Sequence, residues 1–504
     1  MIKNEPIYAP PSSLSLLQSL RGMGYTPKTA IADIIDNSIS AGASEVHLTF
    51  SSDCKYISIF DNGLGMSRDD LISAMKLGFK NPLDSRSSDD LGRFWMGLKT
   101  ASLGICKNLT VFSKTKDNEE ISCARWDLDY LEKVSQEDSS NDWTMLTTPG
   151  EQAEIALSNV SDFSHGTLVV WENLDKVFSN GFNIDDYLEL INDVESHLAI
   201  TFQRYLDKSI KDFSIFIGSK KIKPIDPFFT SNPATQQQPI ANIQCGKSRV
   251  KVQAFILPYT EKLSESEKKS LEHNNDLSTF QGFYVYRENR LIVQGGWLGL
   301  GESYKRWIKE EAYKLARISI DIENSDDQSW KIDIKKSSAQ PPASLKADLI
   351  HIALDARRKS RAVFAHRGQI VSRGRSSDKK IPLWLEGKLS DGSIKFSVNK
   401  DHPYVKAVID ACSDHKLVTN MISLIEQNLP VQKIWLESAE GKDPAIQNNE
   451  NLDALKFQLE FLLDKSLEKY NGQKTRKELL DVFLNSEPYS NYHELYDLMD
   501  VDHE

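Results

Sequence analysis

The sequence lacks any uninterrupted run of apolar residues long enough to cross a membrane as a helix, for which about 20 residues are needed. Its first residues, MIKNEPIYAPPSS, also lack the basic segment and the apolar segment that make up a secretory signal peptide. The usual signatures of a membrane or exported protein are therefore missing. We expect a soluble, cytoplasmic chain with no membrane partner.

Cysteine is scarce, and an excess of positive charge is missing. The 5 cysteines in 504 residues are odd in number and widely separated, which excludes a disulfide framework and the paired spacing of a zinc site. The formal net charge is −11, which argues against a chain that coats nucleic acid over its whole surface. A local basic segment remains compatible with this charge.

The pattern of apolar residues predicts a multidomain fold of mixed α/β and α+β character. Residues 1–220 alternate helical periodicity with strand-like runs such as EVHLTF, YISIFD and TLVVWEN, which indicates a layered α/β domain. Residues 221–345 contain the β-like runs VKVQAFILPY, FYVYRENRLIV and WKIDIKK and a helical stretch around residues 307–316, so we expect a second α/β domain. Residues 346–504 begin with a predicted long helix, ASLKADLIHIALDARRKSRAVFAH, and should form a mainly helical C-terminal module.

The first motif is a helix that carries polar residues on one face. In GYTPKTAIADIIDNSISAGA, a threonine N-cap, a proline at the first helical position and a late glycine predict a helix from residue 27 to about 40. Asp33, Asp36 and Asn37 are spaced i, i+3 and i+4, so they share one face. A solvated face is the simpler interpretation. Because the neighbours are alanine and isoleucine, the face could instead meet a specific polar partner.

The second motif is a strand that runs into glycines, IFDNGLGM, residues 59–66. By itself such a sequence is typical of a turn between strands. A buried Asp61 could alternatively accept a hydrogen bond from an exocyclic amine. Gly63 and Gly65 would then let the backbone approach a flat base closely.

The third motif, DLGRFWMGLKTASLGI at residues 90–105, has the features of a phosphate site. Gly92 and Gly97 precede a predicted helix that begins near Leu98 and carries Lys99, and a helix N-terminus with a nearby lysine attracts phosphate. The extra leucine breaks the register of a Walker A motif. Farther along the chain, Thr167 opens a strand, and its hydroxyl could bond a base directly or through water.

Taken in order and at their intervals, these segments resemble the N box, the two glycine boxes and the terminal threonine of the GHKL ATPases. This superfamily comprises gyrase, the ninety-kilodalton heat-shock chaperones, histidine kinases and MutL. The resemblance covers about residues 10–175 and implies a Bergerat-type α/β sandwich with ATP and Mg²⁺ as cofactors. It assigns activation of the attacking water to Asp33, Mg²⁺ binding to Asn37 and adenine recognition to Asp61.

The same resemblance assigns the remaining contacts to the nucleotide. Adenine and ribose would be bordered by Gly63, Gly65 and Met66, with Thr167 completing the adenine contact, and the phosphates would be surrounded by Gly92, Arg93, Gly97, Leu98 and Lys99. Two positions depart from the family pattern. Asp33 stands where gyrase, MutL and the chaperones have glutamate, and Trp95 stands where many members have glycine. An error on the order of 1 Å in a catalytic group can cost about a hundredfold in rate, so we expect ATP binding and slow hydrolysis.

Residues 221–345 more weakly resemble the transducer domain of gyrase, MutL and MORC proteins, which has a ribosomal S5-like fold. In that domain a lysine on a loop reaches the γ-phosphate, and WKIDIKKSSAQPP offers Lys335 and Lys336 for this role. An equally favoured interpretation is that both lysines are simply exposed at the end of a strand. Across its length the chain looks like bacterial MORC-like or chaperone-like ATPases encoded beside restriction and anti-phage genes.

Residues 357–380 form a local basic segment. The segment contains one acidic residue and nine cationic residues. The cationic residues are Arg357, Arg358, Lys359, Arg361, Arg367, Arg373, Arg375, Lys379 and Lys380. Such a cluster could bind the phosphates of DNA without sequence preference. The alternative is a solvated helix and loop that pair with the acidic remainder of the chain.

Our leading hypothesis is an ATP-gated clamp or switch that forms an ATP-dependent homodimer and acts on DNA in bacterial restriction or defence. A nuclease or another protein of the same operon would be its partner. A chaperone-like protein remodeller and an ATP-sensing module that does not hydrolyse ATP are the alternatives. The departure at Asp33 motivates the second of these.

Overall fold

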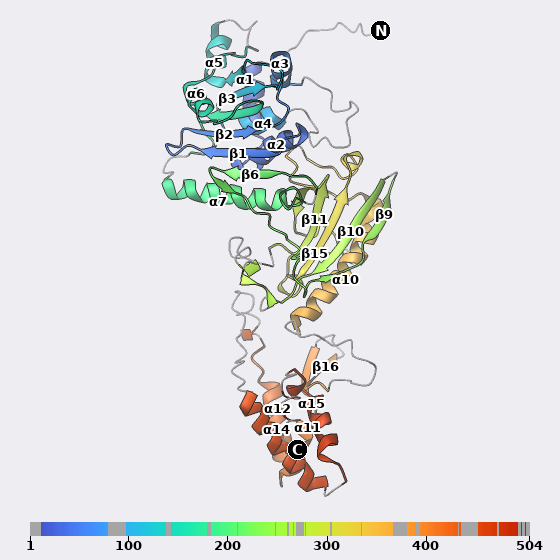
Figure 1. The fold of residues 1–504 in the computed structure, drawn as a ribbon. Coiled ribbons are helices and arrows are strands. Elements are labelled where there is room, and N and C mark those ends of the chain that lie inside the picture. Colours follow the sequence, from blue (N-terminus) through green and yellow to red (C-terminus); the bar gives the residue numbers. More distant parts are fainter. Residues whose placement is uncertain are drawn as a thin grey trace, which may run out of the picture. The chain divides into compact units, whose positions relative to one another are not determined.

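The computed structural model describes residues 12–78, 97–137, 143–178, 183–208, 210–246, 248–259, 262–265, 267–268, 277, 279–302, 305–333, 335–365, 381–388, 394–431, 433–434, 452–470, 473–491, 495 and 499. The chain divides into two compact units, Met1–Gly368 and Gln369–Glu504 (Figure 1). Among the helices within these ranges, none is both long and apolar enough to span a membrane.

The first unit begins with a domain built on a seven-stranded sheet (Figure 1). Across the sheet the strands are β4 (Ser122–Asp127), β3 (Asn108–Lys114), β5 (Gly166–Glu172), β2 (Tyr56–Asp61), β1 (Glu45–Phe50), β6 (Ser214–Ile217) and β7 (Lys220–Lys221). Neighbours run antiparallel except β1 and β6, which are parallel. The ends of β2 and β5 therefore lie side by side, with Asp61 opposite Thr167.

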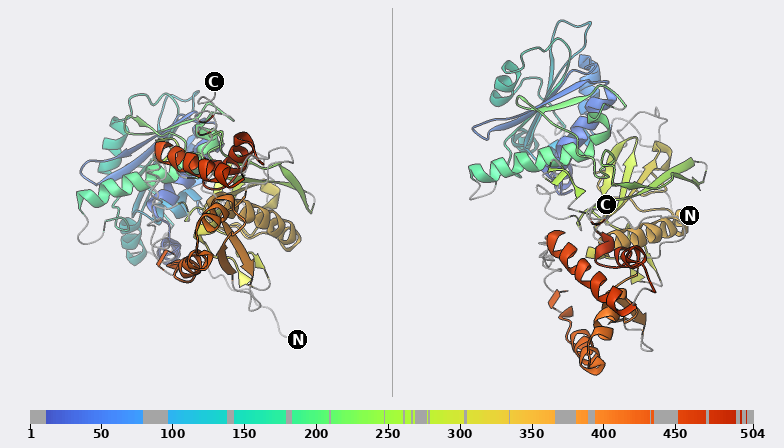
Figure 2. Two further views of the ribbon diagram at one scale, coloured as in Figure 1. Left: turned by 90° about the horizontal axis from the view of Figure 1, so that it is seen from below. Right: turned by 60° about the horizontal axis from the view of Figure 1, so that its bottom comes forward.

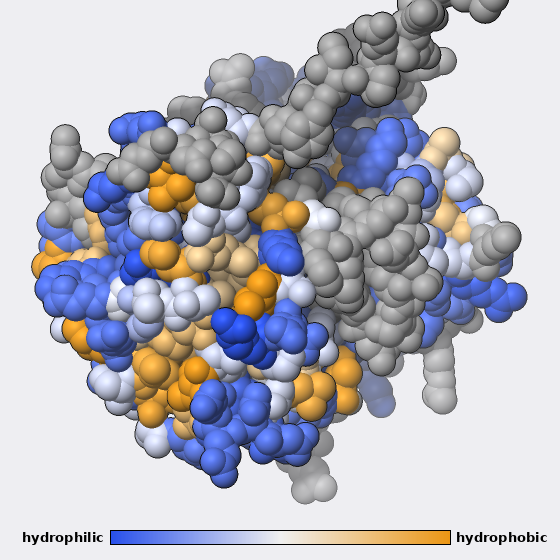
Figure 3. All heavy atoms as spheres, turned by 90° about the horizontal axis from the view of Figure 1, so that it is seen from above, coloured by the Kyte–Doolittle hydropathy of each residue, from blue (hydrophilic) through white to orange (hydrophobic). Residues whose placement is uncertain are grey.

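Helices cover both faces of this sheet. One face packs on the helices α1 (Ser13–Arg21), α2 (Pro27–Ser40), α4 (Gly97–Leu103), α5 (Leu128–Glu137) and α7 (Ile184–Thr201), whose apolar side chains join those of the strands in one core. The other face packs on α6 (Glu151–Ser158). Two further helices are α3 (Arg68–Met75) and the short α8 (Gln203–Leu206). On the face drawn in Figure 3, hydrophilic and apolar side chains lie interspersed.

The predicted helix over residues 27–40 is confirmed as α2, Pro27–Ser40. Its N-terminus is fixed because the Thr29 hydroxyl accepts a hydrogen bond from the Thr26 backbone N–H at 3.0 Å. Gly42, in the left-handed region at φ 77°, follows its C-cap. Nine of its residues are buried, Asp33 and Asp36 among them, so both acids are shielded from solvent, whereas Asn37 on the same face is exposed.

A second sheet of six strands follows within the same unit. Its strands are β12 (Arg290–Gln294), β11 (Gly282–Arg287), β15 (Ala316–Ile322), β10 (Ser248–Ile256) and β8 (Gln236–Gln237) in that order, with β9 (Ala241–Cys245) paired to β10. The same unit also contains the separate two-stranded ribbon of β13 (Gly301–Glu302) and β14 (Lys305–Arg306) and the short 3-10 helices η3 (Glu311–Tyr313), η4 (Asn324–Asp326) and η5 (Ala343–Leu345). The predicted runs VKVQAFILPY and FYVYRENRLIV are confirmed as strands.

The predicted long helix is present as α10 (Lys346–Ala365), and it packs on β10 and β15 of the second sheet. Leu349, Ala353 and Ala356 lie fully buried in the core of that sheet. Because a helix with a small-residue stripe can lie close to a sheet, the structure places α10 with the second sheet, whereas the sequence grouped it with the C-terminal module. The domain boundaries expected at residues 220 and 345 stay predictions.

Two local expectations in this region are wrong. Residues 307–316 contain only the 3-10 turn η3 before β15 begins at Ala316, and Trp307 packs against Trp297 with ring centroids 5.6 Å apart. The run WKIDIKK forms turns within its described residues instead of a strand. Its alternation reflects the burial of Trp330 and Ile332, and the chain reverses at Lys336, whose φ is 50°.

The first domain and the second sheet are joined by polar contacts from α8. The Arg204 guanidinium lies 3.6 Å from the centre of the Tyr286 ring, donates to the Ser319 hydroxyl at 3.0 Å and pairs with Asp321. The Tyr205 hydroxyl donates to the backbone carbonyl oxygen of Glu288 at 2.7 Å. The C-terminal end of α7 approaches this sheet (Figure 2). These contacts bring β12 close to α2.

The second unit contains the hairpin of β16 (Trp384–Lys388) and β17 (Ile394–Val398) and the helices α11 (Pro403–Ala411), α12 (His415–Gln427), α14 (Leu452–Tyr470) and α15 (Arg476–Leu484), with a 3-10 turn, η6 (Tyr489–Asn491). Leucines of α14 and α15 form most of its core. The predicted fold class, α/β sheets with helices followed by a mainly helical C-terminal part, is confirmed.

Candidate active site

Asp61, at the end of β2, is a buried hydrogen-bond acceptor. One carboxylate oxygen accepts from the Ser38 hydroxyl of α2 at 2.9 Å, and the other accepts from the Gly63 backbone N–H at 2.9 Å. Burial raises the pKa of Asp61 to about 6, although these hydrogen bonds act to lower it. The carboxylate is therefore mainly ionised at neutral pH and is anchored from both sides.

Thr167, on β5, lies opposite Asp61 and belongs to a small hydroxyl network. Its hydroxyl is 2.9 Å from the Ser113 hydroxyl, which also donates to the Gly166 carbonyl oxygen at 3.0 Å. The Met66 backbone N–H donates to the same Ser113 oxygen at 2.9 Å. The structure thus brings Asp61, Met66 and Thr167 together, and it adds Ser113, which the sequence motifs did not single out.

The two glycines after Asp61 are required by close packing. A Cβ atom on Gly65 would lie 1.9 Å from the Lys114 carbonyl oxygen, and the residue has φ 67°. A Cβ atom on Gly63 would lie 2.8 Å from an Asp61 carboxylate oxygen. Any side chain here would displace the backbone or the carboxylate, so this loop presents main-chain atoms beside Asp61.

The predicted phosphate residues are only partly described. Gly92 and Arg93 lie outside the described residues, whereas Gly97 and Leu98 begin α4. A Cβ atom on Gly97 would lie 4.0 Å from the Asp33 carboxylate, so the start of α4 adjoins the predicted catalytic acid.

Lys99 is buried and directed at the end of α3. Its ammonium donates to the Ala74 carbonyl oxygen at 2.7 Å and to the Lys76 carbonyl oxygen at 3.1 Å. Burial lowers the pKa of Lys99 to about 8. In the structure Lys99 therefore caps a helix C-terminus, and its contact with phosphate stays a prediction.

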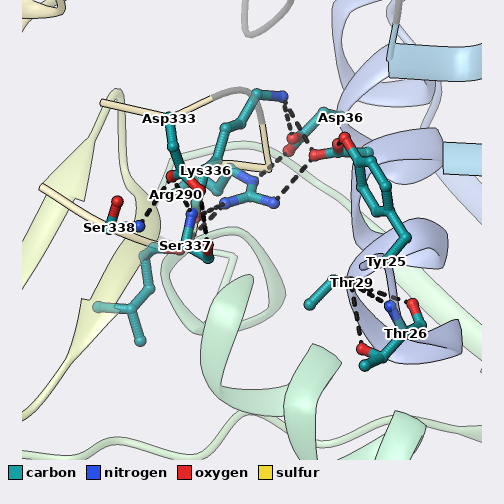
Figure 4. Close-up of polar contacts among 11 residues, drawn as sticks. Tyr25, Thr26, Thr29, Asp36, Arg290, Asp333, Lys336, Ser337 and Ser338 are labelled. Atoms are coloured by element: carbon teal, nitrogen blue, oxygen red, sulfur yellow. Dashed lines mark hydrogen bonds and ion pairs between the residues drawn. The ribbon is translucent and has the colours of Figure 1, made fainter. Parts of the chain in front are cut away.

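The centre of the site is a buried cluster of two acids and two cations (Figure 4). Asp36 is 2.7 Å from the Arg290 Nε and 2.5 Å from the Lys336 Nζ. Asp33 is 3.4 Å from an Arg290 terminal nitrogen and 3.5 Å from the Lys336 Nζ. The Tyr25 hydroxyl donates to the second oxygen of Asp33 at 2.8 Å.

Burial raises the pKa of Asp33, while the neighbouring cations Lys336 and Arg290 oppose this shift. Burial and the Asp33 charge likewise raise the pKa of Tyr25, so Tyr25 remains a proton donor to Asp33. A buried carboxylate with a raised pKa is a better proton acceptor than a solvated one. The arrangement can therefore support general-base chemistry at Asp33.

Lys336 reaches this cluster because a tight turn presents it. The Asp333 carboxylate accepts from the backbone N–H groups of Ser337 and Ser338, both at 2.8 Å, which closes the turn around Lys336 (Figure 4). The Lys335 ammonium lies 3.8 Å from the Cβ position of Gly24. Of the two candidate lysines, Lys336 is the one that contacts the acids.

Arg290 was missed by the sequence analysis. It opens β12 directly after Glu288 and Asn289, which both have positive φ. The only local signal is an arginine placed before the apolar run LIV, at a position where a buried strand begins.

Asn37, the predicted Mg²⁺ ligand, is exposed on α2 one residue beyond Asp36. An amide oxygen is a suitable ligand for a hard cation that keeps several waters and binds substrate phosphates. Within the described ranges, no group of three or more His, Cys, Asp or Glu side chains is arranged to hold a metal ion. Asn37 therefore stays a predicted ligand.

Arg357, predicted to contact DNA, is buried. Its guanidinium lies 3.6 Å from the centre of the Tyr313 ring and 4.8 and 4.9 Å from the centres of the Trp297 and Trp307 rings. A terminal nitrogen is also 3.5 Å from Glu310. The side chain is 8% exposed, so this prediction is corrected: the rings shield the charge from a phosphate backbone.

The other basic candidates on α10 face solvent or pair locally. Arg358 is 79% exposed and lies 2.6 Å from Asp355, which also pairs with Lys359 at 2.7 Å. Arg361 is exposed. Outside the described residues lie Arg367, Arg373, Arg375, Lys379 and Lys380.

Comparison with known proteins gives a family match and several similar relatives. Residues 25–167 match the family described as histidine kinase-, DNA gyrase B-, and HSP90-like ATPase. ATPase morc-1 of Caenorhabditis elegans is 28% identical over 104 residues, 20% of this chain and 12% of that protein. From Mus musculus, ATPase MORC2B is 26% identical over 151 residues (28% and 14%), and MORC family CW-type zinc finger protein 3 is 30% identical over 115 residues (22% and 12%). The matched segments are thus a small part of each relative.

Proposed function

We propose that this chain, whose residues 25–167 match the family of histidine kinase-, DNA gyrase B-, and HSP90-like ATPases and which is similar to MORC ATPases, binds ATP with Mg²⁺ and hydrolyses it to ADP and phosphate. The observation that carries the proposal is the position of Asp33. Its buried carboxylate lies beside the start of α4, where phosphates would bind, and faces the cations Arg290 and Lys336.

In this proposal different residues of the first domain contact the base, the metal and the phosphates of the nucleotide. Asp61 accepts a hydrogen bond from the adenine amine, and the glycine loop contacts the base through its backbone. Asn37 would hold Mg²⁺, which would neutralise charge on the phosphates when bound. These contacts position the γ-phosphate toward Asp33.

Asp33 acts as the general base. It takes a proton from water as the water oxygen bonds to the γ-phosphorus and the bond to the bridging oxygen breaks, which leaves ADP. The Lys336 ammonium exchanges its ion pair with Asp36 for an oxygen of the γ-phosphate and thereby reports the presence of that group to the second sheet. Asp33 is one methylene shorter than glutamate, so turnover is slow.

ATP hydrolysis by the purified full chain with Mg²⁺ tests this proposal. We expect Asp33→Ala to keep nucleotide binding and to lose turnover by about 100-fold or more, the usual contribution of a general base. Asn37→Ala should lose both binding of the metal–nucleotide complex and turnover. Glu154→Ala is the control, since Glu154 is exposed on α6, which covers the opposite face of the sheet. A wild-type protein that binds no ATP would overturn the assignment.

We propose further that ATP closes a homodimeric clamp on DNA in a bacterial restriction or anti-phage setting, together with a nuclease or another operon partner. The exposed cations Arg358 and Arg361 on α10 support a DNA contact. Binding of duplex DNA should weaken steeply with salt, and sedimentation should give a dimer with a non-hydrolysable ATP analogue and a monomer with ADP. DNA binding that is insensitive to salt, or a mass that does not depend on nucleotide, would refute the clamp.

A further inference from the structure

Arg290 is held on every side of its guanidinium. Its Nε lies 2.7 Å from Asp36, one terminal nitrogen lies 3.4 Å from Asp33, and the other donates to the backbone carbonyl oxygens of Leu291 at 3.2 Å and of Lys336 at 3.4 Å. The side chain is 3% exposed. A planar fork with this many partners is fixed in place.

Arg290 therefore contacts three parts of the proposed reaction at once. It touches the general base Asp33, the acid Asp36 one residue before the metal ligand, and the main chain of the turn that carries Lys336. The first two lie on α2 of the first domain, whereas Arg290 itself opens β12 of the second sheet. Within the described ranges, Arg290 and Lys336 are the cations that pair with both acids.

The two cations differ in mobility. Lys336 holds the acids through one ammonium at the end of a flexible chain, which can exchange one anion for another. When Lys336 turns to a phosphate, Asp36 loses one of its two cationic partners. A buried carboxylate left without any cation would be strongly destabilising, so a second and fixed cation is needed for the exchange to occur. Arg290 has the geometry of that fixed cation.

We propose that Arg290 is a positioning residue for ATP hydrolysis, which keeps Asp33 and the Lys336 turn in a constant relation while Lys336 exchanges Asp36 for the γ-phosphate. The inference rests on the proposed function and deepens it. In this proposal Arg290 contacts neither the attacking water nor the nucleotide. Its effect should therefore appear in kcat and leave the affinity of the Asp61 pocket unchanged.

Arg287 provides a matched control. It is also a buried arginine of the β11–β12 hairpin and is 1% exposed. It pairs with Asp327, which directly follows η4, at 2.6 and 2.9 Å. Its replacement removes a comparable buried ion pair without touching Asp33 or Asp36.

The test measures kcat and KM for ATP in the full chain for Arg290→Gln and Arg287→Gln, with melting temperatures alongside. We expect Arg290→Gln to lower kcat about 10- to 100-fold with KM within about threefold, because a misplaced catalytic group costs rate rather than binding. Arg287→Gln should keep kcat within about threefold of the wild type, even if its melting temperature falls as much as that of Arg290→Gln. If Arg290→Gln does not fold, the isosteric Asp36→Asn, which removes the charge that Arg290 holds, should show the same loss of kcat.

A double-mutant cycle separates positioning from general stabilisation. If Arg290 acts through Asp36, Arg290→Gln combined with Asp36→Asn should lower kcat no further than the more severe single change. Equal losses of kcat in Arg290→Gln and Arg287→Gln, or a kcat of Arg290→Gln within twofold of an active wild type, would overturn the positioning role alone. An inactive wild type would overturn the proposed function and the positioning role with it.

Discussion

Lowering the pH from about 7.5 to about 5 is expected to have opposite effects on the stability of the first domain and on its affinity for ATP, and Asp61 is the cause of both. Burial raises the folded pKa of this carboxyl from 3.8 to about 6. Between these values the folded protein binds more protons than the unfolded chain. Stability from Asp61 therefore increases as the pH falls through about 6 and is lost as the pH rises through it. Between pH 7.5 and 5 the gain is about 1.4 kcal/mol, the part of the full effect of about 3 kcal/mol that lies in this range.

Nucleotide binding should change in the other direction. Ionised Asp61 accepts a hydrogen bond from the adenine amine, whereas the protonated group loses acceptor strength on one oxygen. With a pKa of about 6, about a tenth of the molecules carry the ionised form at pH 5. The affinity for ATP should then fall about tenfold relative to pH 7.5.

Calorimetric titration with ADP or ATP and urea denaturation, both from pH 5 to 7.5, would measure the two effects. Asp61→Asn is the matched variant, because it keeps the shape of the side chain and does not titrate. Subtracting its pH dependence removes the contribution of other acids. An affinity that stays constant within twofold, together with the expected gain in stability, would refute adenine recognition by Asp61; the absence of both effects would refute the raised pKa.

Three further predictions follow from close packing and burial. Gly65→Ala places a Cβ 1.9 Å from the Lys114 carbonyl oxygen, so it should lower the free energy of unfolding by about 2 kcal/mol or more, and an unchanged urea midpoint would contradict this packing. Arg357→Ala should destabilise by about 3 kcal/mol because three rings lose their cation, whereas Arg358→Ala should cost less than about 0.5 kcal/mol; the reverse order in calorimetry would refute the burial of Arg357. Lys99→Met should cost about 1–3 kcal/mol and speed hydrogen exchange in α3, because two carbonyl groups lose a charged donor, and unchanged exchange would argue that Lys99 does not cap this helix.

Local signals explain what the sequence could predict. The N-cap, the proline and the late glycine determine where α2 begins and ends, since each acts within one helical turn. The glycines after Asp61 are visible as a motif because a left-handed or closely packed backbone admits little else. These short-range rules located the acids on α2, the loop of Asp61 and most strands.

Long-range contacts explain what the sequence could not predict. Arg290 meets Asp36 across 254 residues, and no periodicity in the chain records such a pairing. The strand expected at residues 330–336 was wrong for a similar reason. Trp330 and Ile332 are apolar because they fill a core, and not because they alternate along a strand. Arg357 is a further case, since a basic run in the sequence does not reveal that one member stacks among three rings.

The cluster of Asp33, Asp36, Arg290 and Lys336 is a poor way to obtain stability. Removing four charged groups from water is costly, and apolar side chains of similar volume would hold α2 against β12 at least as firmly. An apolar contact, however, could not be exchanged for a phosphate. An ion pair can be exchanged, because a lysine released from Asp36 can pair with a phosphate, which is also an anion. Arg290 keeps Asp36 paired during this exchange. In the proposed function, the presence of charge where hydrophobic packing would suffice corresponds to a contact that must break and re-form as the bound nucleotide changes.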